Sequence, residues 1–347
     1  MDTLTHALSG ALLARATASV ASVSLPRRLA VGTVAAAFPD SDFVASFISS
    51  LAYLLHHRGI THSVVMLPVW AWLLALLAAL VWRDPRGWRP YWGIAALGIG
   101  VHILGDLITS YGTMIWAPIS DARYGLGTTF IIDPWFTLII LAGLALSVAR
   151  RRSTVPAIAS LAVLVAYVGS QAWLKSEAID VGLRHAAQEM TPAIVSVQPG
   201  PVSPFNWMVV EQHGSDYRYT MINLLRGEPA KKVPLEPEFL YRLSAGFDPP
   251  GLAQWRTASL HGSGPDAALV REAWAQPQIG FFRWFAQYPA LYRVDRGNPS
   301  TCVWFYDLRF FRPGTEFLPF RYGLCRENEG RWRRFQLIGN SGRAALD

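Results

Sequence analysis

Acidic side chains are scarce in the first half of this 347-residue chain, and lysine is missing from it. Residues 1–174 contain seven acidic residues, all of them aspartate, and 11 basic residues, all of them arginine. The chain carries a net charge of +7, but it has no polybasic block, which argues against nucleic acid as a partner. The densest basic run, at 331–334, is typical of a solvated strand or of a contact with anionic lipid.

Cysteine is also rare, because the chain has only Cys302 and Cys325. Both fall in a hairpin that we expect over 301–326, folded about a loop near 313–314. The two side chains would then lie almost opposite each other. They could form a cross-strand disulfide in an oxidising compartment, or remain a buried free pair.

Long runs without charge are plentiful by contrast. Residues 63–82, 134–149 and 153–174 lack charged side chains, and 90–107 is nearly as apolar. Each is close to the length that crosses about 30 Å of hydrocarbon, so we expect four membrane spans. Shorter apolar pieces at 6–25, 29–39 and 43–55 fit half-helices or interfacial helices. A cleavable signal peptide is disfavoured, because Asp2 and Arg15 replace the usual basic start and unbroken apolar stretch.

Composition changes after Lys175 to mixed charge with proline and glycine. Strand-like runs at 207–212 and 217–225 predict one hairpin, and 301–310 with 317–326 predicts another. Residues 175–190 should continue the last span as a helix. We therefore expect a membrane all-α helical bundle over 1–174 and a soluble α+β domain, mainly of antiparallel strands, over 175–347. His185, His213 and His261 lack spaced carboxylate partners and are interpreted as surface or core residues.

Arginine-rich short loops remain in the cytoplasm. The loops at 83–89 and 150–152 are separated by two predicted crossings, so both can lie inside, and Arg27 with Arg28 fits the same parity. Residues 40–62, the loop 110–130 and everything after 175 would then face the periplasm or exterior. This pattern predicts a multi-pass protein of the bacterial inner membrane, with its site and its C-terminal domain outside.

The most informative feature is His102 with Asp106, one helical turn apart in an apolar helix. A carboxylate near hydrocarbon costs roughly 2.5–3.5 kcal/mol, so it should have a partner. The spacing places an imidazole and a carboxylate on one helix face, as in zinc-protease helices. Together with the other clustered histidines and aspartates, it predicts a metal site drawn from His6, Asp40, Asp42, His57, His62, His102 and Asp106.

A mixed set of histidine and aspartate suits Zn²⁺ best, with Mn²⁺ or Fe²⁺ as alternatives. We expect one or two ions. The choices between Asp40 and Asp42, and between His57 and His62, remain open. Arg58 would supply a fixed cation for an anionic substrate, or it could be an interfacial arginine, and we count Arg58 and Asp40 as candidate catalytic residues. The plainer interpretation of a lone intramembrane histidine is a packed helix contact.

Four motifs in order carry a resemblance to a known family: Met1-Asp-Thr-Leu-Thr-His6, Pro39-Asp-Ser-Asp42, His57-Arg-Gly-Ile-Thr-His-Ser63, and His102-x-x-x-Asp106 followed by Thr109-Ser-Tyr-Gly-Thr113. Over about residues 1–150 the chain resembles the DUF457 family, the YdjM/YbcI-like inner-membrane proteins described as metal-dependent hydrolases. The order of ligands is also similar to that of the zinc-dependent phospholipase C and S1/P1 nuclease fold. That likeness implies one metal on Asp40 or Asp42, His57 or His62, His102 and Asp106, and a second on His6 and a bridging Asp106.

These features together predict a membrane-embedded metal-dependent hydrolase that activates water for attack on a phosphoester. A site at the membrane surface implies a membrane lipid or lipid-linked substrate. The alternatives are a non-enzymatic protein that binds or transports metal, and a degenerate scaffold that acts through a protein partner of its C-terminal domain. The sequence does not identify such a partner.

Overall fold

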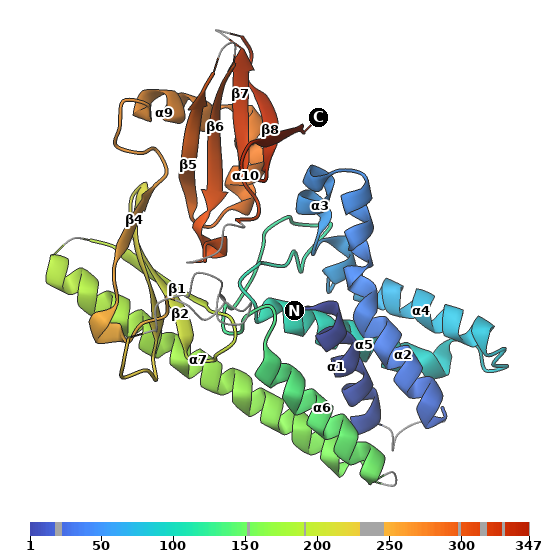
Figure 1. Cartoon of the computed structure of the whole chain (residues 1–347). Coiled ribbons are helices and arrows are strands. Elements are labelled where there is room, and N and C mark those ends of the chain that lie inside the picture. Colours follow the sequence, from blue (N-terminus) through green and yellow to red (C-terminus); the bar gives the residue numbers. More distant parts are fainter. Residues whose placement is uncertain are drawn as a thin grey trace. The chain divides into compact units, whose positions relative to one another are not determined.

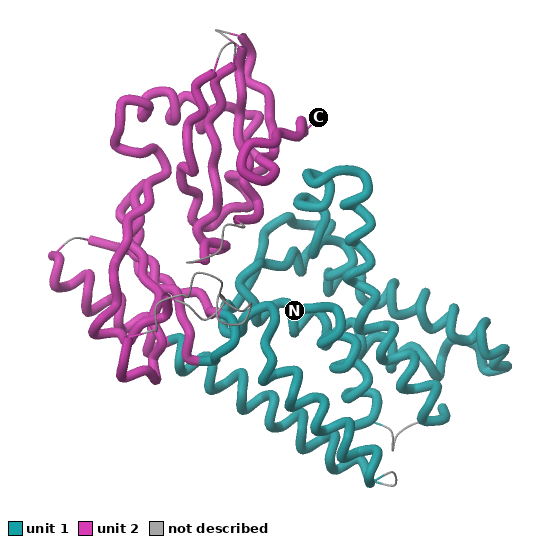
Figure 2. The backbone as a smooth tube through the Cα atoms, viewed as in Figure 1, with its two compact units in different colours: residues 1–175, 201–204 teal, residues 176–200, 205–347 magenta. Residues whose placement is uncertain are grey.

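The computed structural model describes residues 1–17, 23–150, 153–190, 192–229, 246–297, 300–312, 318–327 and 330–346. These residues divide into two compact units (Figure 2). Unit 1 comprises Met1–Lys175 with Pro201–Pro204, and unit 2 comprises Ser176–Gly200 with Phe205–Asp347. The boundary expected after residue 174 falls inside one long helix, α7, which contributes its first part to unit 1 and its last part to unit 2.

Unit 1 consists of α-helices with two 3-10 segments among them and a non-helical connection over 108–133 (Figure 1). In chain order these are α1 (Thr3–Ala16), α2 (Leu25–Ala37), η2 (Phe38–Phe47), α3 (Ser50–His56), η3 (Ile60–His62), α4 (Leu67–Val81), α5 (Arg89–Leu107), α6 (Pro134–Ala149) and α7 (Val155–Glu189). Two of the scarce aspartates begin helices. Asp2 accepts the backbone N–H of Thr5 at 2.9 Å, and Asp133 accepts those of Trp135 and Phe136, as N-cap residues do.

Small residues let three helices of unit 1 approach closely. A Cβ atom built on Gly10 of α1 would lie 2.1 Å from the carbonyl oxygen of Gly32 in α2, and one on Gly98 of α5 would lie 2.8 Å from Cβ of Ala35. Alanine side chains fill much of the surrounding core, among them Ala71 and Ala95. Such contacts are typical of helices that pack in membranes. They hold α1, α2 and α5 together, and these three helices surround the site described below.

The prediction of four membrane spans is wrong. Among the described residues, one helix, α7, is long and apolar enough to cross a membrane, and there are up to two such segments if the bent pair Ser50–His62 and Leu67–Val81 is one span. The apolar run at 63–82 begins with a turn, so α4 has only 15 residues. At 1.5 Å per residue that is about 22 Å, short of about 30 Å of hydrocarbon. α6 has 16 residues, and α5 includes Arg89, His102 and Asp106, which lower its hydropathy.

Unit 2 contains two antiparallel sheets of sequential strands. The first is built from β1 (Ile194–Pro199), β2 (Asn206–His213), β3 (Asp216–Asn223) and β4 (Arg256–Ser259), and the second from β5 (Pro289–Arg296), β6 (Ser300–Asp307), β7 (Tyr322–Glu327), β8 (Arg333–Ile338) and β9 (Gly342–Ala345). Short helices lie between them, η4 (Pro250–Leu252), α9 (Ala267–Ala275), η5 (Pro277–Ile279) and α10 (Gly280–Phe285), and η6 (Leu308–Phe310) follows β6. Side chains of both sheets share one core, in which Met208 and Tyr219 meet Tyr288 and Tyr306.

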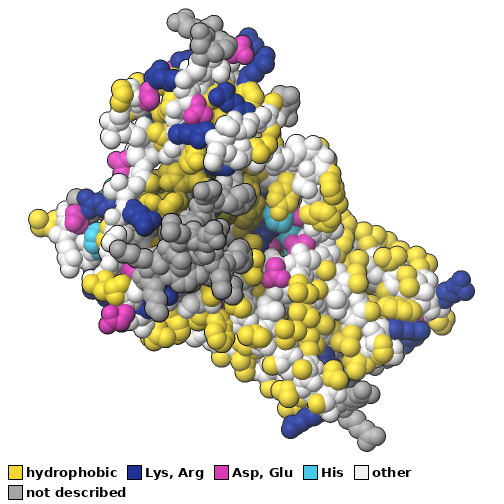
Figure 3. All heavy atoms as spheres, viewed as in Figure 1, with side chains coloured by type: hydrophobic (Ala, Val, Ile, Leu, Met, Phe, Trp, Pro, Cys, Tyr) yellow, Lys and Arg dark blue, Asp and Glu magenta, His cyan; other side chains and the backbone are white. Residues whose placement is uncertain are grey.

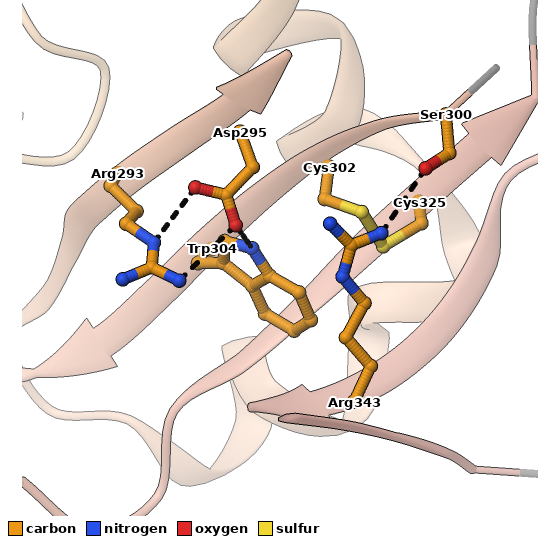
Figure 4. The surroundings of a disulfide bond; sticks show 7 residues. All are labelled: Arg293, Asp295, Ser300, Cys302, Trp304, Cys325 and Arg343. Carbon is orange, nitrogen blue, oxygen red and sulfur yellow. Dashed lines mark hydrogen bonds and ion pairs between the residues drawn. A yellow bond between two sulfur atoms is a disulfide. The ribbon is translucent and has the colours of Figure 1, made fainter. Parts of the chain in front are cut away.

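Both predicted hairpins are confirmed. β2 pairs with β3 through a two-residue turn at Gly214, whose φ of 64° suits a tight hairpin. β6 pairs with β7, and Cys302 lies directly opposite Cys325 in that register. The two cysteines form a disulfide (Figure 4). The loop expected near 313–314 lies outside the described residues.

Two histidines of unit 2 do have a carboxylate partner, contrary to the sequence prediction. Glu211 of β2 is buried and lies 2.8 Å from Nδ1 of His185, which comes from the last part of α7. Its other oxygen lies 3.6 Å from Nε2 of His213. Strand alternation places Glu211 and His213 on the same face, and a helix distant in sequence supplies His185, so linear spacing could not reveal this cluster.

Candidate metal centre

Four side chains from three elements of unit 1 meet at one place. η2 supplies Asp40, η3 supplies His62, and α5 supplies both His102 and Asp106. One ligand atom from each lies within 4.8 Å of the other three, so the group could hold a metal ion. We call these four residues the His/Asp group.

The measured separations fit a small coordination sphere. Nε2 of His62 lies 3.2 Å from Oδ2 of Asp106 and 3.7 Å from Oδ1 of Asp40, and Nε2 of His102 lies 3.7 Å from each of the same two oxygens. A tetrahedron with ligands about 2.0–2.1 Å from zinc has edges of about 3.3 Å. These four separations lie within about 0.4 Å of this edge length, and all separations within the group are at most 4.8 Å.

Three of these ligand atoms have no other partner. Nε2 of His62, Nε2 of His102 and Oδ2 of Asp106 are buried without a hydrogen bond. Buried polar atoms in native proteins are nearly always satisfied, so each exception needs an explanation. A shared cation would satisfy all three at once, because imidazole nitrogen and carboxylate oxygen are the donors that Zn²⁺ prefers.

The other nitrogen of each imidazole fixes the orientation of its ring. Nδ1 of His102 lies 2.6 Å from the carbonyl oxygen of Ala36, which can only accept, so Nδ1 carries the proton and Nε2 keeps its lone pair. Nδ1 of His62 lies 3.0 Å from Oγ1 of Thr61, which in turn donates to Asp42. Such support of metal-binding histidines is the usual arrangement around bound metals.

Asp106 is held by its other oxygen. Oδ1 accepts from Nη2 of Arg58 at 2.9 Å and lies 3.1 Å from Nε2 of His6, and the amino group of Met1 also contacts it. These donors leave Oδ2 directed at His62 and His102. The carboxylate is fully buried, and its negative charge is stabilised by the fixed cation of Arg58.

Asp40 is the one member of the group that reaches the surface, with a side chain 13% exposed. Its second oxygen accepts from the hydroxyl of Thr3 at 2.6 Å. Burial by itself would raise the pKa of Asp40, but the neighbouring imidazoles of His62 and His102 and the hydrogen bond from Thr3 hold it well below its usual value. Asp40 is therefore a carboxylate at neutral pH, as a metal ligand must be.

The comparison with known proteins agrees with the motif resemblance. The sequence profile described as "YdjM inner membrane protein" matches residues 1–178, which is about half of the chain. This chain belongs to the YdjM inner membrane protein family. The matched region covers all of unit 1 apart from Pro201–Pro204, including the His/Asp group.

One curated relative of this YdjM-family chain is "Uncharacterized protein YfhP" of Bacillus subtilis (strain 168). The two are 27% identical over 172 residues, which is 48% of this chain and 52% of the relative. The chain thus spans about half the length of that relative. No solved structure matches the chain.

Three of the seven predicted metal ligands of this YdjM-family protein lie outside the His/Asp group. His57 and Asp42 contact each other, with Nδ1 of His57 2.8 Å from Oδ1 of Asp42. His6 contacts Asp106 and stacks on His102, with ring centroids 3.6 Å apart. All three adjoin the group, and the geometry favours Asp40 and His62 where the sequence left a choice.

Arg58 occupies an unexpected place. It is 1% exposed and has a φ of 60°, a left-handed backbone conformation that is uncommon outside glycine. Its guanidinium contacts Asp106 and donates to Oγ1 of Thr109 at 2.8 Å, and it lies over the ring of Tyr111. These contacts make Arg58 a support for Asp106, and its burial is inconsistent with an interfacial arginine. The role of Arg58 as a cation for an anionic substrate stays a prediction.

The visible surface of unit 1 combines apolar areas with a polar patch (Figure 3). Hydrophobic side chains cover much of its visible face in Figure 3, with one patch where histidine and acidic side chains lie together. His56, which neighbours the group in sequence, is exposed and lies outside it.

Proposed function

We propose that this protein is a membrane-embedded, metal-dependent hydrolase that acts on a phosphoester of a lipid or lipid-linked substrate. The observation that carries this proposal is the set of three unsatisfied buried ligand atoms beside the partly exposed Asp40. A buried set of imidazoles and carboxylates that opens at one member is typical of a metal site accessible to a substrate.

A bound divalent ion, Zn²⁺ in our proposal and Mn²⁺ or Fe²⁺ as alternatives, would lower the pKa of water to about 7 and neutralise charge that develops at phosphorus. The His/Asp group would hold this ion with two neutral imidazoles and two carboxylates, so the ligand charge matches a divalent cation. Arg58 and His6 would keep the carboxylate of Asp106 in place.

His57 is the residue suited to move a proton in this reaction. Asp42 lies 2.8 Å from its Nδ1 and orients the ring, which also stacks on Tyr53 at 4.6 Å between centroids. With Nδ1–H donated to Asp42, Nε2 carries the lone pair, so it could take a proton from the attacking water and return that proton to the leaving oxygen. The side chain of His57 is 14% exposed, so a substrate at the Asp40 side can reach it.

One observation favours a second candidate, a protein that binds metal without catalysis. Four protein ligands complete a tetrahedron, and closed tetrahedral sites are usually structural, whereas catalytic zinc sites keep an open position. Catalysis would require the ion to accept a fifth ligand, or Asp40 to dissociate from it. The partial exposure of Asp40 makes it the ligand best placed to do so.

The test combines metal analysis with two substrates. The purified protein in detergent or nanodiscs is assayed for bound metal, and for hydrolysis of bis(p-nitrophenyl) phosphate and of phospholipid vesicles. We expect about one equivalent of metal or more and a chelator-sensitive activity that Asp106→Asn abolishes. Metal bound without activity on either substrate would support the second candidate.

A further inference from the structure

A hydrophobic tip protrudes beside the His/Asp group. η2 and α3 form a helical hairpin, and the tip of this hairpin exposes four apolar side chains. Phe43, Val44, Phe47 and Ile48 are 52%, 55%, 80% and 81% exposed. Phe43 and Phe47 also contact each other edge to face, with ring centroids 5.8 Å apart. Exposed apolar patches of this kind mark contacts with proteins, ligands or membranes.

The chemistry of the tip favours a bilayer as its partner. Residues 43–55 contain no charged side chain, and their polar groups are serine and tyrosine hydroxyls. Protein interfaces normally carry a polar rim that includes charged groups and arginine. Exposed phenylalanine and aliphatic side chains are instead what membrane-surface helices bury at the boundary between headgroups and acyl chains.

The course of the chain agrees with this partner. Ser50–His62 and Leu67–Val81 are together long and apolar enough to form a membrane segment. The two parts are bent by 79°, so this segment is either a broken span or a re-entrant loop. α3 begins directly after the tip and is part of that segment. Unit 1 also lies in the region that matches an inner-membrane protein family, so a bilayer is available as the partner of the tip.

We propose that the η2–α3 tip inserts into the bilayer and delivers an amphiphilic substrate, with an acyl or prenyl chain along Phe43 and Phe47 and its phosphate at the His/Asp group. The delivery step rests on the proposed hydrolase function, whereas insertion of the tip does not.

The spacing within η2 matches this arrangement. Asp40 and Phe47 are seven residues apart in one 3-10 helix, and at about 2.0 Å per residue this is about 14 Å. Interfacial apolar faces enter about 5–10 Å into the boundary between headgroups and acyl chains. With Phe47 at that depth and η2 along the membrane normal, as the proposal requires, Asp40 lies within the headgroup region, where a lipid phosphate resides.

Insertion is tested with a fluorescent label. Both native cysteines are in the disulfide, so Ile48→Cys gives a single thiol for an environment-sensitive NBD dye on the full chain in phosphatidylglycerol/phosphatidylethanolamine vesicles. Ser263→Cys, at an exposed polar position of unit 2, is the control. We expect a blue-shifted emission, shielded from aqueous iodide, at position 48 alone. Equal iodide quenching at both positions would overturn the proposal.

Delivery is tested with two substrates. The double variant Phe47→Ser/Ile48→Ser should hydrolyse phospholipid in vesicles at least tenfold more slowly, and bis(p-nitrophenyl) phosphate within twofold of the original rate. Leu252→Ser/Ile338→Ser removes two side chains of unit 2 that are each 55% exposed, and it should change neither rate.

The outcomes separate the two proposals. Unchanged phospholipid hydrolysis in the tip variant, or equal loss on both substrates, would overturn delivery. If the unaltered protein hydrolyses neither substrate, the hydrolase proposal fails and delivery fails with it, while the label at position 48 still decides whether the tip enters the bilayer.

Discussion

His102 donates its Nδ1 proton to the carbonyl oxygen of Ala36 at 2.6 Å. This single bond connects α5 to the end of α2, four residues before Asp40. It fixes the proton of His102 on the nitrogen that faces away from the His/Asp group, and it holds α5 against the segment that supplies another member of that group. The orientation of the ligand and the position of its neighbour therefore depend on the same contact.

Replacing His102 should remove the metal. His102→Ala deletes one of the three unsatisfied buried ligand atoms, so we expect bound metal to fall from about one equivalent to a small fraction of that value. His56→Ala is the matched control, because His56 is exposed and lies outside the group. Mass-spectrometric metal analysis of both variants checks this. Full metal content in His102→Ala would contradict the assignment.

The sequence indicated the residues of the site but not their roles. An i,i+4 pair in one helix has fixed geometry, so His102 and Asp106 could be placed together from spacing alone. His57 and His62 are separated by a turn through Arg58 in a left-handed conformation, which sends the two imidazoles to different partners. Spacing along the sequence does not reveal such a turn. The sequence alone therefore could not decide which of the two histidines belongs to the His/Asp group.

His57→Gln should separate catalysis from metal binding. The change keeps a polar side chain but removes the group proposed to donate a proton, so we expect kcat for a phosphodiester to fall by about 100-fold or more. Metal content should stay at the original level, because His57 lies outside the His/Asp group. A variant that retains full kcat would rule out a role for His57 in proton transfer, and a variant that loses its metal would show that His57 supports the site.

Arg58→Met should destabilise unit 1. The change leaves the buried carboxylate of Asp106 without its guanidinium partner, and breaking a buried ion pair in this way costs about 3–5 kcal/mol. We expect a lower thermal unfolding midpoint and weaker metal binding. Arg218→Met is the control, because Arg218 and its partner Glu189 are 36% and 44% exposed. Equal midpoints for the two variants would count against a structural role of Arg58.

The fold shows a similar limit of sequence reasoning. Residues 63–82 are uniformly apolar, but Ser63 accepts the backbone N–H of Val65 and donates to the carbonyl oxygen of Ala117, so the helix begins only at Leu67. Hydropathy measures composition and cannot detect where a helix begins. The strands of unit 2 were easier to predict, because alternation and turn residues are local signals.

Unit 2 should lie outside the cytoplasm. Its Cys302–Cys325 disulfide requires an oxidising compartment, and the arginine-rich loop at 83–89 favours the cytoplasmic side. We expect alkaline phosphatase fused after Asp347 to be active in a bacterial host and a green fluorescent protein fused there to stay dark. Maleimide labelling should reach the cysteines only after reduction. A fluorescent fusion together with freely labelled thiols would instead show that unit 2 lies in the cytoplasm.

Adding one methyl group to α5 should have opposite effects at two glycines. A Cβ at position 98 would lie 2.8 Å from Cβ of Ala35 and 3.0 Å from the carbonyl oxygen of Gly32, so Gly98→Ala must push α5 away from α2. Overpacking of this kind costs about 1–3 kcal/mol, and it should also weaken metal binding by separating His102 from Ala36. At Gly93 a Cβ would meet nothing within 4 Å, and Gly93→Ala should stabilise the helix by up to about 1 kcal/mol. Thermal unfolding and metal titration of the two variants measure both effects. If Gly98→Ala left metal affinity unchanged, close packing of α5 on α2 would not be what positions the ligands.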